Sequence, residues 1–232
     1  MSRLGIVTGL SMEAARIRTA SRGLQDADMP IIGVAGGSAE RAAGLARQQV
    51  AAGARALVSF GLAGGLDPSL LPGDIVIGAT VWRNSGPPLD MTGPWAQSIA
   101  AGLQRECRVR IGGVAGVDAP AVSVAAKAAL RLRSGALAVD MESHGTASAA
   151  AELGIPILVI RAVADPSMRA VPAAALAGMG SDGRRRPFAV LGRLLFRPSD
   201  LPGLIRLAGD SAAAMRSLAV AARVLFRETG SD

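Results

Sequence analysis

Two carboxylates stand close to the ends of apolar stretches, and they are the residues best suited to chemistry. Glu142 comes shortly after the strand-like segment 136–139, and Asp165 shortly after the apolar run 155–160. An open α/β sheet presents the residues that follow its strands to a ligand at the carboxyl edge of the sheet. Carboxylates in such a place can accept hydrogen bonds from hydroxyl groups or exchange protons with a ligand.

One helix is predicted between these two strands, and it determines how the carboxylates are placed. Residues 147–153 are strong helix formers, and Gly154 provides a stop signal. A strand, a helix and a strand of this length form a right-handed crossover, in which both strands run parallel and end at the same edge. We therefore expect Glu142 and Asp165 to lie near each other.

A third acid, Glu13, is predicted in the first turn of a helix. Residues 4–8 form an apolar strand, Gly9 opens a turn, and a helix begins near Met12. A strand that leads through glycine into a helix N-terminus is a ready site for an anion or another ligand. Glu13 is also explained as an acid that the helix dipole favours, so both interpretations stay open.

The same arrangement recurs after the second predicted strand, 31–35. Gly36, Gly37 and Ser38 lead from this strand into the helix 39–52. Ser38 is suited to cap that helix, and it is also placed to contact a phosphate or a ligand hydroxyl group. The sequence leaves both alternatives open.

The remaining segments continue the alternation of strands and helices. Strands are predicted at 56–60, 75–81 and 111–117, a helix at 123–133, and an irregular loop at 83–95. The glycine-rich stretch 61–66 allows close approach of a ligand or another strand. The fold class is therefore a single α/β domain over residues 1–232, with a central twisted sheet, mostly parallel or mixed, and helices on its faces.

The C-terminal region, 184–227, is predicted to be helical and basic. Apolar residues recur at helical spacing over 201–227, so we expect a long amphipathic helix whose apolar face packs on the sheet. The shorter segment 188–197 is apolar and flanked by arginines. It is explained either as a helix that lies on a membrane surface or as an ordinary core or oligomer-interface helix.

Composition narrows the function classes. The net charge is +7, and 50% of the residues are hydrophobic but only 3% aromatic. Basic and aromatic residues are not interleaved as in single-strand binders, so we expect no nucleic acid partner. One cysteine excludes a disulfide framework and a cysteine-rich metal site, and no uncharged apolar stretch reaches the roughly 18 residues of a membrane span. We expect a cytoplasmic protein without a metal.

Four motifs together resemble those of the nucleoside phosphorylases and nucleosidases, the family that includes methylthioadenosine/S-adenosylhomocysteine nucleosidase. They cover residues 4–166 in order and are Gly5-Ile6-Val7 with Glu13, Gly61-Leu62-Ala63-Gly64-Gly65-Leu66 with Pro72-Gly73-Asp74-Ile75-Val76, Val139-Asp140-Met141-Glu142-Ser143, and Ala162-Val163-Ala164-Asp165. The resemblance implies a homo-oligomeric enzyme that cleaves the bond between a purine and ribose without a cofactor.

The resemblance also implies roles for individual residues. Asp165 matches the general acid that protonates the five-membered ring of the departing purine. Glu142 matches the carboxylate that binds two adjacent ribose hydroxyl groups, and Met141 matches the residue packed beneath the sugar. Glu13 matches the residue that orients and activates water in the nucleosidases. The substrate site is further expected to include Phe60, Gly64 and Asp140.

Departures from the phosphorylase pattern leave the nucleophile open. Leu62 and Ser59 stand where phosphorylases carry a serine and, in some members, an arginine. A phosphate site would instead be formed by Gly9, Ser38 and Arg41 at two helix N-termini, with inorganic phosphate as a co-substrate. The alternative nucleophile is water.

The contact to the base departs from the family as well. Pro120 stands where nucleosidases carry an aromatic residue that stacks on the base. The adenine would then be held by Phe60 or by apolar residues alone. His144, the single histidine, directly follows the ribose-binding segment and is interpreted as a helix-surface residue rather than a substrate contact.

The basic C-terminal region and the Asp165-Pro166 junction are most similar to the hopanoid-associated branch of the family. That branch is implied to remove adenine from adenosylhopane, a lipid-linked nucleoside, which suits peripheral contact of the region 184–197 with the inner membrane. The alternatives are a soluble methylthioadenosine/S-adenosylhomocysteine nucleosidase and a nucleoside-binding protein without catalytic activity.

Overall fold

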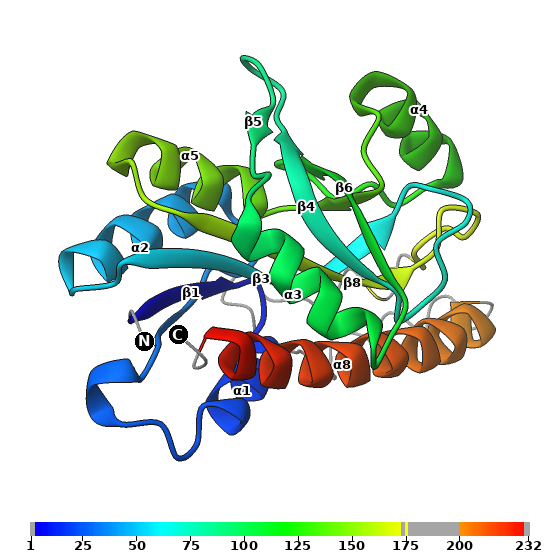
Figure 1. Ribbon diagram of the computed structural model, residues 1–232. Helices are drawn as coiled ribbons and strands as arrows, with labels where there is room; N and C mark the ends of the chain where they lie inside the picture. Colours follow the sequence, from blue (N-terminus) through cyan, green and yellow to red (C-terminus); the bar gives the residue numbers. More distant parts are fainter. Residues whose placement is uncertain (1–2, 173–174, 176–199, 230–232) are drawn as a thin grey trace.

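The computed structural model describes residues 3–172, 175 and 200–229, which form one α/β domain (Figure 1). In these residues the strands are β1 (Leu4–Thr8), β2 (Ile31–Val34), β3 (Ala56–Gly65), β4 (Ile75–Trp82), β5 (Leu89–Asp90), β6 (Val109–Gly116), β7 (Ala138–Asp140) and β8 (Ile157–Asp165). The α-helices are α1 (Ser11–Ala20), α2 (Ala39–Ala51), α3 (Pro94–Gln104), α4 (Val124–Ser134), α5 (Ser143–Leu153) and α8 (Leu201–Thr229). The predicted fold class is confirmed.

The centre of the sheet closes on itself. β3 pairs with β7 and β8, β6 pairs with β7 and β4, and β4 pairs with β8, so these five strands form a ring. β1 and β2 extend the sheet from β3, and β5 pairs with β4. Parallel and antiparallel pairs both occur, which makes the sheet mixed.

The crossover predicted for residues 136–160 is wrong in its strand directions. β7 runs antiparallel to β3, whereas β8 runs parallel to β3, and β7 does not pair with β8. The reason is that β3 continues through the glycine-rich stretch and ends at Gly65 rather than at Phe60. Gly64 pairs with Val139 on one side and with Asp165 on the other. The two acidic segments therefore meet across β3.

The loop predicted at 83–95 contains more regular structure than its proline and glycine content suggests. β5 lies within it. The helix α3, which was not predicted from the sequence, begins at Pro94 and continues to Gln104. Proline is well tolerated in the first turn of a helix, where its missing N–H has no helical acceptor. Pro94 therefore starts a helix here instead of marking a loop.

Helices cover both faces of the sheet (Figure 1). α1, α3 and α8 pack together on one face, and α2 and α5 pack together on the other. The largest cluster of buried apolar residues lies under α8 and includes Phe60, Ile160, Leu218 and Leu225. The prediction of a long amphipathic helix at 201–227 is thus confirmed.

The arginine-flanked segment 188–197 lies outside the described residues, as does most of the region 184–200. None of the helices in the described part of the chain combines the length and hydropathy that crossing a bilayer requires.

Candidate active site

Glu13 is held at the junction of three elements. It lies in the first turn of α1, with only 2% of its surface exposed. Its Oε2 accepts hydrogen bonds from the amides of Gly9 at 2.9 Å and Leu10 at 2.8 Å, and its Oε1 accepts one from Leu62 of β3 at 2.8 Å. Burial raises the pKa of Glu13, although these amides and the charge of Arg161 act in the opposite direction.

Glu142 lies directly before α5 and is 8% exposed. Its Oε1 accepts a hydrogen bond of 2.9 Å from the amide of Gly37, which adopts a φ of +75° that favours glycine. Burial and the negative charge of Asp140 raise the pKa of Glu142 to about 7, while Arg161 lowers it in part. The charge of Glu13 also raises this pKa, so the two carboxylates are close enough to interact.

Two glycines make room for these carboxylates. A Cβ atom at Gly9 would lie 2.5 Å from Oε1 of Glu142, and a Cβ atom at Gly61 would lie 2.9 Å from Oε2 of Glu13. Both separations are well below van der Waals contact. Any side chain at either position would displace a carboxylate.

A buried arginine of β8, Arg161, lies next to both carboxylates and is 1% exposed. It forms an ion pair with Asp140, and its Nη2 donates hydrogen bonds to the hydroxyl groups of Ser59 at 2.6 Å and Ser143 at 3.1 Å. Ser143 donates in turn to Asp140 at 2.6 Å. Asp140, which we expected to line the substrate site, therefore orients Arg161. An arginine within an apolar strand was the sequence signal for this network, and it was missed.

Asp165 ends β8 on the other side of Gly64. Its Oδ2 forms an ion pair with Lys127 of α4, and a Cβ atom at Gly64 would lie 3.2 Å from that oxygen. Burial raises the pKa of Asp165, while Lys127 and Arg169 act to lower it. This carboxyl group therefore retains a proton more readily than an ordinary aspartate. Lys127 was also missed by the sequence reading.

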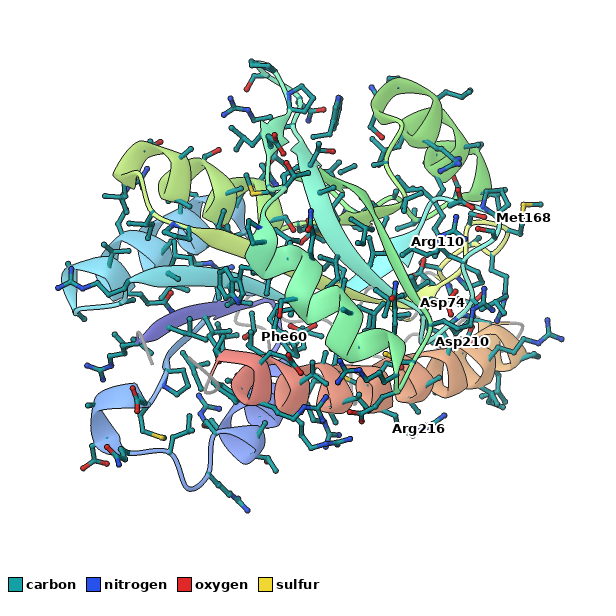
Figure 2. The ribbon with its side chains drawn as sticks, viewed as in Figure 1. Phe60, Asp74, Arg110, Met168, Asp210 and Arg216 are labelled. Atoms are coloured by element: carbon teal, nitrogen blue, oxygen red, sulfur yellow. The ribbon has the colours of Figure 1, made fainter. Side chains whose placement is uncertain are left out.

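Met141 and Phe60 point in different directions. The methyl end of Met141 lies beside Gly37, where a Cβ atom would be 3.5 Å away, so this side chain is close to Glu142. Phe60 is fully buried between the sheet and α8 (Figure 2). Because side chains alternate along a strand, Phe60 points away from the face where Ser59 binds Arg161. The role expected of Phe60 is corrected: its ring belongs to the core.

The residues expected to bind phosphate have other partners. The amide of Gly9 donates to Glu13, and the hydroxyl group of Ser38 accepts from the amide of Arg41 at 3.3 Å as a helix cap. The guanidinium of Arg41 donates to a backbone carbonyl of the preceding turn at 3.2 Å and is exposed. The capping interpretation of Ser38 is confirmed.

His144 fills the space at the end of β6 instead of lying on the helix surface, which corrects its interpretation. Its side chain is 15% exposed, its Nε2 lies 3.1 Å from Oδ1 of Asp118, and its ring packs over Gly116. A side chain on Gly116 would collide with this ring. Pro120 is exposed in the loop that follows.

Together these elements group three carboxyl groups with raised pKa values around β3: Glu13, Glu142 and Asp165. Carboxyl groups with raised pKa values retain their protons to higher pH than exposed ones and are typical of catalytic sites. No cluster of histidine, cysteine and acidic residues in the described ranges is arranged to hold a metal ion. The arrangement suits a reaction in which one carboxyl group donates a proton while others bind hydroxyl groups or activate a nucleophile.

Several solved structures share this fold. A variant of the Helicobacter pylori nucleosidase MTAN, with 5′-methylthioadenosine in its active site, has a TM-score of 0.72 and 14% identity, with 100% of both chains covered. A futalosine hydrolase of the same organism has a TM-score of 0.72 and 14% identity over 100% of this chain and 98% of its own. The S-adenosylhomocysteine nucleosidase of Streptococcus pyogenes has a TM-score of 0.66 and 18% identity over 72% and 85%.

No curated protein matches the sequence significantly. The model of the phosphorylase superfamily matches residues 8–194, which is most of the chain. The carboxylates and Arg161 lie within the matched range. The chain therefore belongs to the phosphorylase superfamily.

Proposed function

We propose that this enzyme cleaves the N-glycosidic bond of an adenine nucleoside. The observation that carries the proposal is the set of three enclosed carboxyl groups around β3, at Glu13, Glu142 and Asp165, with raised pKa values and separate hydrogen-bond partners. Solved relatives of the same fold include a nucleosidase with 5′-methylthioadenosine in its active site.

The three carboxyl groups have different roles in this reaction. Asp165 transfers its proton to the five-membered ring of the base as the bond between the base and the sugar breaks, and the electron pair of that bond goes to the base. The sugar then develops positive charge, as in other glycosyl transfers. Glu142 accepts hydrogen bonds from two adjacent ribose hydroxyl groups and, with Met141 beside it, fixes the ring. Negative charge near the sugar stabilises the cationic transition state.

Water is the acceptor that the contacts favour. Glu13 is fixed by three backbone amides and lies beside Glu142, so it is placed to take a proton from water as the oxygen adds to the sugar carbon. The amides of Gly9 and Gly37 bind carboxylates, which leaves them no N–H for phosphate. Phosphorolysis remains the second candidate because Arg41 is exposed at the same edge.

For the substrate we propose adenosylhopane, with a soluble methylthioadenosine or S-adenosylhomocysteine nucleosidase as the alternative. The support is compositional: the chain has a net charge of +7, and its segment 184–197 combines apolar residues with arginines. Such a composition is typical of segments that contact anionic lipid surfaces. We propose a cytoplasmic, homo-oligomeric enzyme that meets its lipid-linked substrate at the inner membrane.

The test is adenine release from adenosylhopane, methylthioadenosine and S-adenosylhomocysteine, each with and without inorganic phosphate. Free ribosyl product without phosphate is expected; a strict phosphate requirement would overturn the hydrolytic assignment.

Asp165→Asn should lower the rate of adenine release by about 10²–10⁴-fold, because the donated proton is lost, while circular dichroism shows an unchanged fold. Full activity of this variant would contradict the proposal, and tight binding of a nucleoside without turnover would indicate a non-catalytic protein.

A further inference from the structure

Lys127 is a buried cation that the reaction described above does not use. It lies on α4 and is 0% exposed. Its Nζ contacts Oδ2 of Asp165 and donates hydrogen bonds of 2.9 Å each to the backbone carbonyls of Pro166 and Arg169. An ammonium group has three N–H donors, and each of them has a partner here.

Lys127 is also the single lysine of the chain, since every other member of its 25 basic residues is arginine. The planar guanidinium suits bidentate pairing, whereas an ammonium is a compact charge with three donors in different directions. The three acceptors of Lys127 come from a carboxylate and two carbonyls of the turn that follows it. The residue type therefore fits the geometry of this position.

The contact distinguishes the two oxygens of Asp165. Lys127 holds Oδ2, and no hydrogen bond to Oδ1 is found within residues 3–172, 175 and 200–229. Because the ammonium group only donates hydrogen bonds, the Oδ2 atom that it contacts must act as an acceptor. A proton on the carboxyl group is therefore carried by Oδ1. Oδ1 is thus the oxygen that can face a substrate with its proton.

Building on the proposed function, we propose that Lys127 is the positioning residue of the proton donor. It fixes Oδ2 so that Oδ1 delivers the proton to the departing base, and its charge stabilises the carboxylate that remains. The O–H bond of Asp165 breaks, an N–H bond forms on the base, and the electron pair of the glycosidic bond moves into the base. The carboxylate that results is paired with Lys127 and regains a proton from solvent after product release.

Other charged groups near Asp165 are weaker influences. Arg169, in the turn after β8, lowers the pKa of Asp165, and Asp210 of α8 raises it. These two residues form an ion pair with each other at 2.5 Å, and their charges act on the pKa of Asp165 in opposite directions. Figure 2 shows Asp210 on the N-terminal half of α8, with Met168 above it in this view. Lys127 is the cation in direct contact with the acid.

The test compares three replacements that separate charge from tethering. Lys127→Met removes both the charge and the donors, Lys127→Gln keeps amide donors without the charge, and Lys127→Arg keeps the charge. Adenine release is measured as kcat/KM against pH. The alkaline limb reports loss of the proton from Asp165, and removal of an opposite charge should move it upward by on the order of one to three pH units.

We expect this shift in Lys127→Met and Lys127→Gln, with a lower maximal rate because the weaker acid transfers its proton less readily. Lys127→Arg should keep the wild-type limb. A limb that stays in place in folded Lys127→Gln would overturn the proposal, because Lys127 would then have no influence on the proton of Asp165. If Lys127→Met does not fold, the Gln and Arg variants still decide between charge and tether.

An infrared titration of the Asp165 carboxyl group, identified by its loss in Asp165→Asn, needs no turnover. It should show a higher pKa in Lys127→Gln than in wild type; equal values would overturn the proposal even if no nucleoside is cleaved. Conversely, an Asp165→Asn enzyme that stays active would contradict the proposed function while the titration still reports on Lys127.

Discussion

Glu142 shows how a single residue couples the site to stability. It is buried beside the like charge of Asp140, and Arg161 offsets only part of this repulsion, so its pKa rises from 4.5 to about 7. The folded protein therefore keeps a proton on Glu142 between about pH 4.5 and 7, where the unfolded chain has lost it. The contribution of protonated Glu142 to the free energy of unfolding is complete below pH 4.5 and is lost as pH rises through 7.

Glu142→Gln should remove this pH dependence, because glutamine resembles the protonated side chain and can still accept the hydrogen bond from Gly37. Between pH 4.5 and 8 the free energy of unfolding of wild type should fall by on the order of 3 kcal/mol more than that of the variant. Urea denaturation at several pH values measures the difference. Parallel curves for the two proteins would show that Glu142 titrates normally.

The sequence predicted only part of the candidate site. The three acids were identified as site residues from their motifs, and in the structure Glu13 and Glu142 interact electrostatically. Arg161 and Lys127 were not predicted as site residues. Each lies inside an apolar strand or a helix, and the residues next to it in the sequence do not indicate which acid it pairs with. Their partners, Asp140 and Asp165, are distant in the chain and adjacent only through β3 and α4.

At the scale of elements, β3 organises the site. Its glycine-rich half was not included in the predicted strand 56–60, but it continues β3 to Gly65 and brings β7 and β8 to opposite sides of Gly64. Short-range patterns indicated most strands and helices correctly. They did not indicate that β7 and β8 run in opposite directions, since pairing across β3 depends on contacts between distant segments.

Gly9→Ala tests the fit between a loop and a carboxylate. The added methyl group would meet Oε1 of Glu142 at 2.5 Å and displace it from Gly37, so kcat/KM should fall by about tenfold to a hundredfold. Gly44→Ala is the matched control: its Cβ atom meets nothing within 4 Å in α2, and alanine should stabilise the helix by about 1 kcal/mol without changing activity. Equal activity of both variants would show that Glu142 is not held in place by this fit.

At the scale of the whole molecule, α8 closes one face of the sheet. Its buried side, with Leu218 and Leu225, packs in the same cluster as Phe60 of β3 and Ile160 of β8. The strand that carries Arg161 and Asp165 is therefore supported from behind by this helix. Helical periodicity was sufficient to predict α8 and its apolar side, because the pattern is long and regular.

Leu218→Ala should lower the free energy of unfolding by about 2–5 kcal/mol, because it leaves a cavity under α8. Ile205→Ala on the same helix is the control: this side chain is 64% exposed, and the change should stay within about 0.5 kcal/mol. Chemical denaturation of both variants measures the difference. Similar losses would mean that α8 does not pack on the sheet as described.

The single lysine also has a consequence for covalent modification. Acylating reagents and acetylating enzymes attack the uncharged amine, and the chain offers them one side-chain amine, on Lys127. That amine is enclosed and already engaged as an ammonium group with three acceptors. Acylation at Lys127 therefore requires α4 to separate from the turn at 166–169. The rate of acylation is then a measure of how often these two elements separate.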